Sequence, residues 1–185
     1  MVGNSYKQLT DDIYDDLNPQ FIENSNKIIF SSNRKNDSLL KDIEVKPYNY
    51  NYDLYIFDLN DNRQKTLKRV TNTPSMNEFQ PYEVEPLKYT YLGAENGITN
   101  RYIASYDTVI SSVDTTIRYR YFSKSSIVTN YKRNVLKLDV AEKSKKVGVL
   151  MLHDDSYNLY LGDWGMDKML SSNDVSDTYY QNILN

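Results

Sequence analysis

The sequence predicts an all-β protein made of three repeated units, each a sheet of four short antiparallel strands. Three observations favour this fold class. The 185-residue chain contains 18 tyrosines and only 6 glycines, and tyrosine favours the half-buried surface of a sheet. Apolar and polar residues alternate over short runs, which is the period of a strand with one packed face. One sequence pattern also recurs three times along the chain.

The repeated pattern is anchored by an apolar residue followed by threonine, at Leu9-Thr10, Val70-Thr71 and Val128-Thr129. These pairs lie about sixty residues apart, a regular period that indicates tandem structural repeats. In each copy, a lysine seventeen positions after the threonine begins a run of β-branched, aromatic or other apolar residues. Such runs predict strands at 27–32, 88–92 and 146–151.

A second strand follows in each copy and ends on an aspartate. The sequence predicts these strands at 52–58, 101–107 and 157–163. The intervening segments are rich in Asn, Asp and Gly, which tolerate the left-handed backbone of tight turns. Each pair of strands is therefore expected to form a hairpin, with turns at 33–37, 95–97 and 153–156.

Two further strands complete each unit. An earlier strand is expected at 18–21, 79–82 and 135–138, and the first two contain a proline, which is tolerated at a strand start or edge. A last strand is expected at 64–70 and at 119–128, each leading to the next threonine.

Four antiparallel strands per repeat, in tandem, are typical of β-propeller blades. We treat 1–185 as one propeller segment with blades at about 6–67, 68–125 and 126–185. Only 176–184 has the apolar spacing of a helix, which predicts a short C-terminal one.

Composition and motif content argue against several classes of function. The net charge is -3, and no basic cluster gives the footprint of a nucleic-acid binder. No apolar run approaches the ~20 residues that span a bilayer, and residues 1–10 lack the features of a secretory signal. The chain has no cysteine, so thiolate metal sites and disulfides are excluded. Phosphate-binding loops and nucleophile elbows are absent from the sequence, and we expect no cofactor and no catalytic residue.

The first copy resembles the repeat of TolB-like β-propellers. In that family a threonine closes one blade, a proline-containing strand follows, and K-I-x-F-x-S-x-R precedes D-I-Y-x-x-D. The matching residues here are Leu9-Thr10, 18–21, 27–34 and 52–58. The second and third copies keep the spacing but have Gly93-Ala94-Glu95 and Leu152-His153-Asp154 in place of the Ser-x-Arg signature.

The resemblance covers about residues 6–163 and implies a propeller in a periplasmic or otherwise extracytoplasmic protein. Family members typically have six blades, whereas this chain supplies about three. The resemblance therefore implies either further blades or self-association through open edge strands. It does not imply an activity, because propellers host binding modules and enzymes alike.

Several residues are candidates for binding. Tyr48, Tyr50 and Tyr52 alternate with asparagines in a long insertion between two predicted strands, a composition suited to contact surfaces. Trp164, the single tryptophan, could stack on a ligand or fill a core. His153, the single histidine, lies in a predicted surface turn.

Two acidic segments could bind a hard cation. The cluster Asp11, Asp12, Asp15 and Asp16 is more simply a solvated loop, and 58–62 lacks the glycine and glutamate of a calcium loop and indicates a turn. We predict no metal site in either segment.

We predict a non-catalytic propeller module that binds a protein or cell-envelope partner through its loops. The alternative is the propeller part of an enzyme, resembling prolyl-oligopeptidase-like peptidases or oligogalacturonate-lyase-like proteins, with its catalytic residues outside this chain. A third alternative is a partial gene product without a separate activity.

Overall fold

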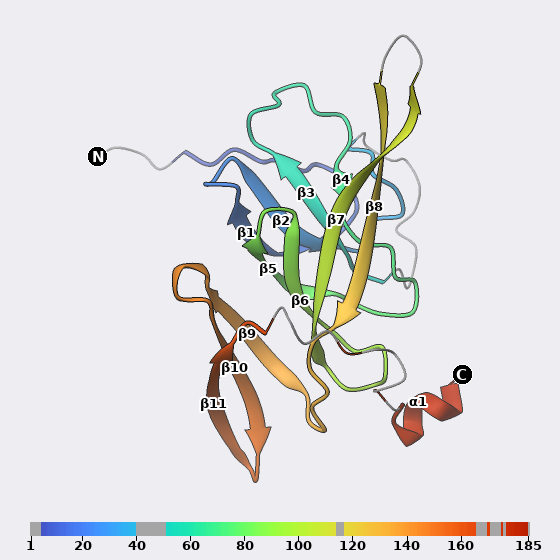
Figure 1. Ribbon diagram of the computed structural model, residues 1–185. Coiled ribbons are helices and arrows are strands. Elements are labelled where there is room, and N and C mark those ends of the chain that lie inside the picture. Colours follow the sequence, from blue (N-terminus) through green and yellow to red (C-terminus); the bar gives the residue numbers. More distant parts are fainter. Residues whose placement is uncertain are drawn as a thin grey trace.

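The computed structural model describes residues 5–39, 51–113, 117–165, 170, 175 and 177–184. These residues form three antiparallel sheets, each built from strands that follow one another in the chain (Figure 1). The predicted all-β fold of repeated, blade-like sheets is confirmed. Among the described residues, no helix has the length and apolar composition needed to cross a bilayer.

Sheet 1 contains four strands in the order β1-β2-β3-β4. They are β1 (Asp16–Ile22), β2 (Lys27–Ser32), β3 (Asp53–Asp58) and β4 (Lys68–Arg69). The two central strands were predicted almost to the residue because each contains a short run of apolar, β-branched or aromatic residues. The last strand was expected over 64–70, but only two residues of it pair with β3.

Sheet 2 repeats the same order with longer outer strands. Its strands are β5 (Phe79–Glu85), β6 (Lys88–Gly93), β7 (Asn100–Val113) and β8 (Ile117–Ile127). The prediction that the third strand ends at Asp107 is wrong, since β7 continues to Val113 and pairs with β8 along its length. No strand was expected over 108–118.

Sheet 3 contains three strands in the described part of the chain, β9 (Val135–Ala141), β10 (Lys146–His153) and β11 (Ser156–Asp163). A short 3-10 turn, Glu142–Ser144, joins the first two. Asp154 and Asp155 both have positive φ in the β10–β11 turn, as a two-residue type I′ hairpin requires. In the described part of the chain, the short α-helix α1 (Tyr179–Leu184) lies within the predicted C-terminal range.

The prolines mark a bulge that recurs in sheets 1 and 2. Asn18 and Gln80 each precede a proline and have φ values of 52° and 51°. At both places the pairing between the first two strands of the sheet shifts register. The same local irregularity at the same position supports the repeat inferred from the sequence.

The three sheets stack in one direction, and each has two distinct faces. In each sheet, the first and third residues after the repeated lysine lie on one face, which we call the leading face. The second and fourth residues lie on the opposite face, which we call the trailing face. The trailing face of sheet 1 packs on the leading face of sheet 2 through one core, formed by residues that include Ile29, Leu54, Ile56, Tyr89, Tyr91 and Tyr102.

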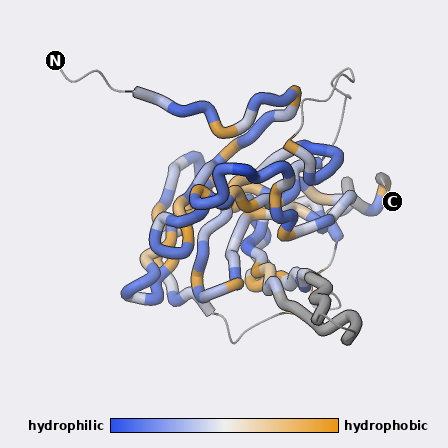
Figure 2. The backbone as a smooth tube through the Cα atoms, turned by 90° about the horizontal axis from the view of Figure 1, so that it is seen from above, coloured by the Kyte–Doolittle hydropathy of each residue, from blue (hydrophilic) through white to orange (hydrophobic). Residues whose placement is uncertain are grey.

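The next interface repeats this arrangement. Leu92 on the trailing face of sheet 2 packs with Val147, Val149 and Met151 on the leading face of sheet 3. The first strands also lie close together, since β1 contacts β5 and β5 contacts β9. Figure 2 shows short hydrophobic stretches distributed among hydrophilic ones along the chain, with hydrophilic residues on many of the outer connections.

Candidate functional site

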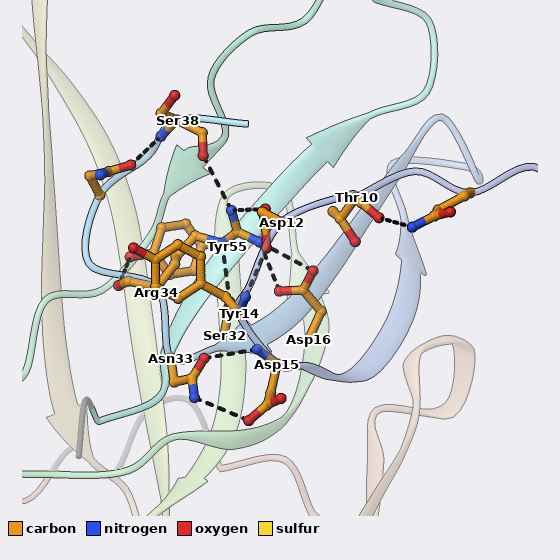
Figure 3. Close-up of polar contacts among 12 residues, drawn as sticks. Thr10, Asp12, Tyr14, Asp15, Asp16, Ser32, Asn33, Arg34, Ser38 and Tyr55 are labelled. Carbon is orange, nitrogen blue, oxygen red and sulfur yellow. Dashed lines mark hydrogen bonds and ion pairs between the residues drawn. The ribbon is translucent and has the colours of Figure 1, made fainter. Parts of the chain in front are cut away.

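Arg34 is the centre of a buried polar cluster on sheet 1 (Figure 3). The residue is 1% exposed, although the sequence had placed it in the turn at 33–37. Its Nη2 donates to both carboxylate oxygens of Asp16 at 2.9 and 3.1 Å, and its Nη1 donates to Asp12 Oδ2 at 3.1 Å. Its Nε donates to Ser32 Oγ at 3.0 Å. A buried guanidinium is tolerated here because its charge is paired and its donors are satisfied.

Aromatic rings surround the same guanidinium. The Arg34 Cζ lies 5.5 Å from the ring centroids of Tyr14 and Tyr55 and 5.9 Å from that of Phe30. The Tyr55 hydroxyl donates to the Arg34 carbonyl at 3.3 Å. The cluster therefore ties the segment that enters sheet 1 to the leading face of that sheet.

The interpretation of segment 11–16 as a solvated loop is corrected for Asp12, Asp15 and Asp16, whereas Asp11 is exposed. The Asp12 and Asp16 side chains are 2% and 19% exposed and both bind Arg34. Asp15 accepts hydrogen bonds from Asn33 Nδ2 at 3.2 Å and from the Tyr52 hydroxyl at 3.3 Å. The sequence could not reveal these partners, because they lie 18 to 37 positions away.

The second acidic segment forms turns, as predicted. Asp58 Oδ1 accepts the Asn60 N–H at 2.9 Å and Asp61 Oδ1 accepts the Arg63 N–H at 3.0 Å. These are Asx turns, in which a side chain replaces a backbone acceptor. Within the described ranges, no three potential metal ligands cluster.

The repeated threonine joins the third and fourth strands of its sheet. In sheet 1, the Val70 N–H donates to the Leu54 carbonyl at 2.8 Å, and the Leu54 N–H donates to Thr71 Oγ1 at 2.8 Å. Asp53, at the start of β3, accepts the N–H of Thr73 at 2.9 Å. The threonine and the acidic residue thus satisfy backbone donors where the regular pairing ends.

Sheet 2 repeats these bonds with equivalent residues. The Val128 N–H donates to the Arg101 carbonyl at 2.8 Å, and the Arg101 N–H donates to Thr129 Oγ1 at 2.9 Å. Asn100, at the position of Asp53, accepts the Tyr131 N–H at 2.8 Å. The apolar-threonine pair found in the sequence therefore closes sheets 1 and 2.

Glu78 is a buried acid beside the threonine of sheet 1. It is fully buried, and the hydroxyls of Thr71 and Thr73 donate to its carboxyl oxygens. Burial raises the pKa of Glu78 to about 7, against a smaller lowering by the two hydroxyls. Burial and the neighbouring Glu78 also raise the pKa of Tyr91 well above its usual value. This carboxyl lies inside the core, where it holds the end of β4 to the start of β5.

The predicted tyrosine cluster is described only in part. Tyr48 and Tyr50 lie outside the described residues. Tyr52 is half-buried, donates its hydroxyl to Asp15, and its ring centroid lies 5.6 Å from that of Phe79. Tyr52 therefore also packs against the sheets.

The other two candidates lie at sheet 3. His153 is exposed at the end of β10, with its Nδ1 3.7 Å from Asp154 Oδ2. Trp164 is 7% exposed and belongs to the core between sheets 2 and 3, and the ammonium of Lys145 lies 5.7 Å from its ring centroid. The described candidates are not brought into one site.

Sequence reasoning missed the trailing face of sheet 3, which we call the open face. A groove of about 370 Å³ crosses it, lined by apolar and charged side chains that include Leu150, Leu159, Leu161, Lys137, Asp139 and Lys146. Leu159 and Leu161 are 78% and 76% exposed. A signal was present in the sequence, because these leucines occupy the positions of buried residues in the first repeat.

The second missed feature is a projecting arm formed by β7 and β8 (Figure 1). β6 pairs with β7 only from Asn100 to Ser105, whereas β7 and β8 pair with one another as far as Val113 and Ile117. The outer part is a two-stranded ribbon, a structure that is marginal by itself in water.

Comparison with models of known protein families and with curated proteins found no match to the chain.

Proposed function

We propose that the chain is part of a TolB-like β-propeller in an extracytoplasmic protein, and that it binds a protein or cell-envelope partner without catalysis. The projecting β7–β8 arm is the observation that carries this proposal. Its outer pairs extend beyond the strand that anchors them in the sheet. A ribbon that extends beyond the strand anchoring it is well suited to contact another molecule.

The two buried polar clusters hold strands together, which favours a binding role for the chain over catalysis. Arg34, Asp12 and Asp16 satisfy one another, and Glu78 is bonded to two threonines inside the core. The first strands of the three sheets contact one another in sequence, β1 with β5 and β5 with β9. This supports the propeller interpretation, because the first strand of each blade lines the centre of such a ring.

An arm deletion tests the proposal. Tyr106 pairs with Ser123, so residues 107–122 can be replaced by Asn-Gly, which favours a two-residue hairpin turn. The immobilised wild-type chain is expected to retain one or more proteins from an envelope extract of the source cells, and the shortened chain is expected to lose them.

The matched control replaces Asp154-Asp155 with Asn-Gly at the tight β10–β11 turn, which leaves the arm intact. Circular dichroism and urea unfolding check that both variants fold. Capture of the same proteins by the shortened chain, or cleavage of a peptide or pectin substrate by the wild type, would contradict the proposed function.

A further inference from the structure

The open face of sheet 3 occupies a position that is covered in the other two sheets. In the shared register, Leu159 and Leu161 correspond to Leu54 and Ile56 of sheet 1, since Lys27 pairs with Asp58 as Lys146 pairs with Asp163. Leu54 and Ile56 are 0% and 2% exposed beneath sheet 2. An equivalent sheet is therefore expected to cover the two leucines of sheet 3.

The edge of β11 is also open in the described structure. β3 pairs with β4 and β7 pairs with β8, whereas β11 pairs with β10 alone. β11 has eight residues and contains neither lysine nor proline. A long edge strand without these protecting residues readily pairs with another chain.

The N-terminal segment 5–10 resembles the strand that is missing at the edge of β11. It ends in Leu9-Thr10, the pair that ends the fourth strand of sheet 1 and of sheet 2. Residues 5–8 are exposed and in no strand, with Tyr6 92% exposed. This segment has the sequence of a fourth strand, yet within the described residues it belongs to no sheet.

The register of sheets 1 and 2 predicts which residue of the N-terminal segment would lie opposite each residue of β11. In sheet 1, Tyr55 pairs with Arg69, two residues before the threonine. In sheet 2, Tyr102 pairs with Ile127, again two residues before the threonine. The equivalent third-strand residue in sheet 3 is Tyr160, because Tyr160 pairs with Val149 as Tyr102 pairs with Tyr91.

Sheets 1 and 2 also share a side-chain acceptor at the start of the third strand. Asp53 and Asn100 accept the N–H two residues beyond the threonine. The equivalent residue of β11 is Asn158, which can accept the N–H of Asp12 in the same manner.

We propose that residues 5–10 of a second copy of this chain pair with β11 as the fourth strand of sheet 3. Gln8 lies opposite Tyr160, and Thr10 Oγ1 accepts the Leu159 N–H. The sheet 1 that follows this segment then covers the open face, placing the half-buried Ile28 and Phe57 of its leading face against the exposed leucines.

The partner is a second copy because one chain cannot reach its own β11. Asp12 and Asp16 are fixed to Arg34 on sheet 1, and Figure 1 places the N-terminal segment and β11 at opposite ends of the stack. The contact is head-to-tail, and such contacts generate rings when the rotation closes. Two copies of three sheets supply six, which is within the range of about four to eight blades in a closed propeller.

Sedimentation velocity and targeted disulfides test this assembly. The chain has no cysteine, so Gln8→Cys combined with Tyr160→Cys introduces a single pair. Oxidation is expected to give a covalent dimer on non-reducing gels. The off-register control, Gln8→Cys with Leu161→Cys, places the two thiols on opposite faces and is expected to stay uncross-linked.

Point variants separate the proposed contact from the stability of the chain. Leu159→Asp with Leu161→Asp is expected to give a folded monomer. Thr10→Val is expected to raise the dimer dissociation constant about tenfold for each of the two contacts, because it removes one hydrogen-bond acceptor. Thr129→Val is the matched control, since it removes the equivalent hydroxyl within sheet 2 and leaves the dimer constant unchanged.

A monomeric wild-type chain at about 100 μM, or a dimer that the Gln8/Tyr160 pair fails to cross-link, would overturn the inference. An intramolecular cross-link would also overturn it, because the strand would then come from the same copy. The arm lies outside this contact, so failure of the dimer leaves the arm-deletion result to be decided separately.

Discussion

The buried carboxyl of Glu78 makes the stability of the fold depend on pH. Burial raises its pKa from 4.5 to about 7, so the folded chain holds this proton more tightly than the unfolded chain. The stabilising contribution is complete below about pH 4.5 and is lost as the pH rises through about 7. At about 1.4 kcal/mol for each pH unit, the difference amounts to about 3 kcal/mol.

Urea unfolding between pH 5 and pH 8 measures this effect. Glu78→Gln keeps the shape of the side chain and a carbonyl acceptor for a threonine hydroxyl but cannot ionise. We expect the wild type to lose about 2 to 3 kcal/mol more than this variant between the two pH values. Glu85→Gln is the matched control, because Glu85 is 38% exposed and pairs with Lys88 at the surface, and it is expected to keep the wild-type slope. Equal slopes for wild type and Glu78→Gln would refute the reasoning.

Three further predictions concern residues that join the strands or pack between them. Arg34→Met is expected to cost about 3 to 5 kcal/mol in urea unfolding, since Asp12 is left buried without its partner, and a change below about 1 kcal/mol would contradict this role. Thr129→Val is expected to cost about 1 to 3 kcal/mol by leaving a strand N–H unpaired. Gly93→Ala is expected to lower the melting temperature because its Cβ would overlap a core methionine, whereas Gly162→Ala meets no atom within 4 Å and is expected to be neutral.

Much of the fold could be predicted because the strands that build the cores are short runs of β-branched, aromatic or other apolar residues. β2, β3, β6, β10 and β11 lie within two residues of their predicted bounds. The arm was predicted only in part, because a strand was expected at 119–128 but the preceding strand was taken to end on the repeated aspartate, Asp107, so its continuation to Val113 was missed. Local sequence also cannot distinguish a two-residue pairing such as β4 from a full strand.

The polar sites were harder to predict than the strands. Arg34 follows Asn33 in a segment with the composition of a turn, and nothing near it in the sequence indicates that two aspartates 18 and 22 positions earlier bind it. The threonine repeat was visible, but its role was not. That role depends on Leu54 and Arg101 presenting an N–H to a side chain rather than to a strand.

The difference between leading and trailing faces gives the stack of sheets a polarity, like that of a filament with two unlike ends. The contact that adds sheet 2 to sheet 1 is used again to add sheet 3, and nothing in the contact itself limits the number of additions. A polar stack ends only when the rotation from one sheet to the next brings the last face round to the first. The angle between neighbouring sheets, more than the strength of any core, therefore decides whether such a repeat forms a ring of fixed size or an open fibre.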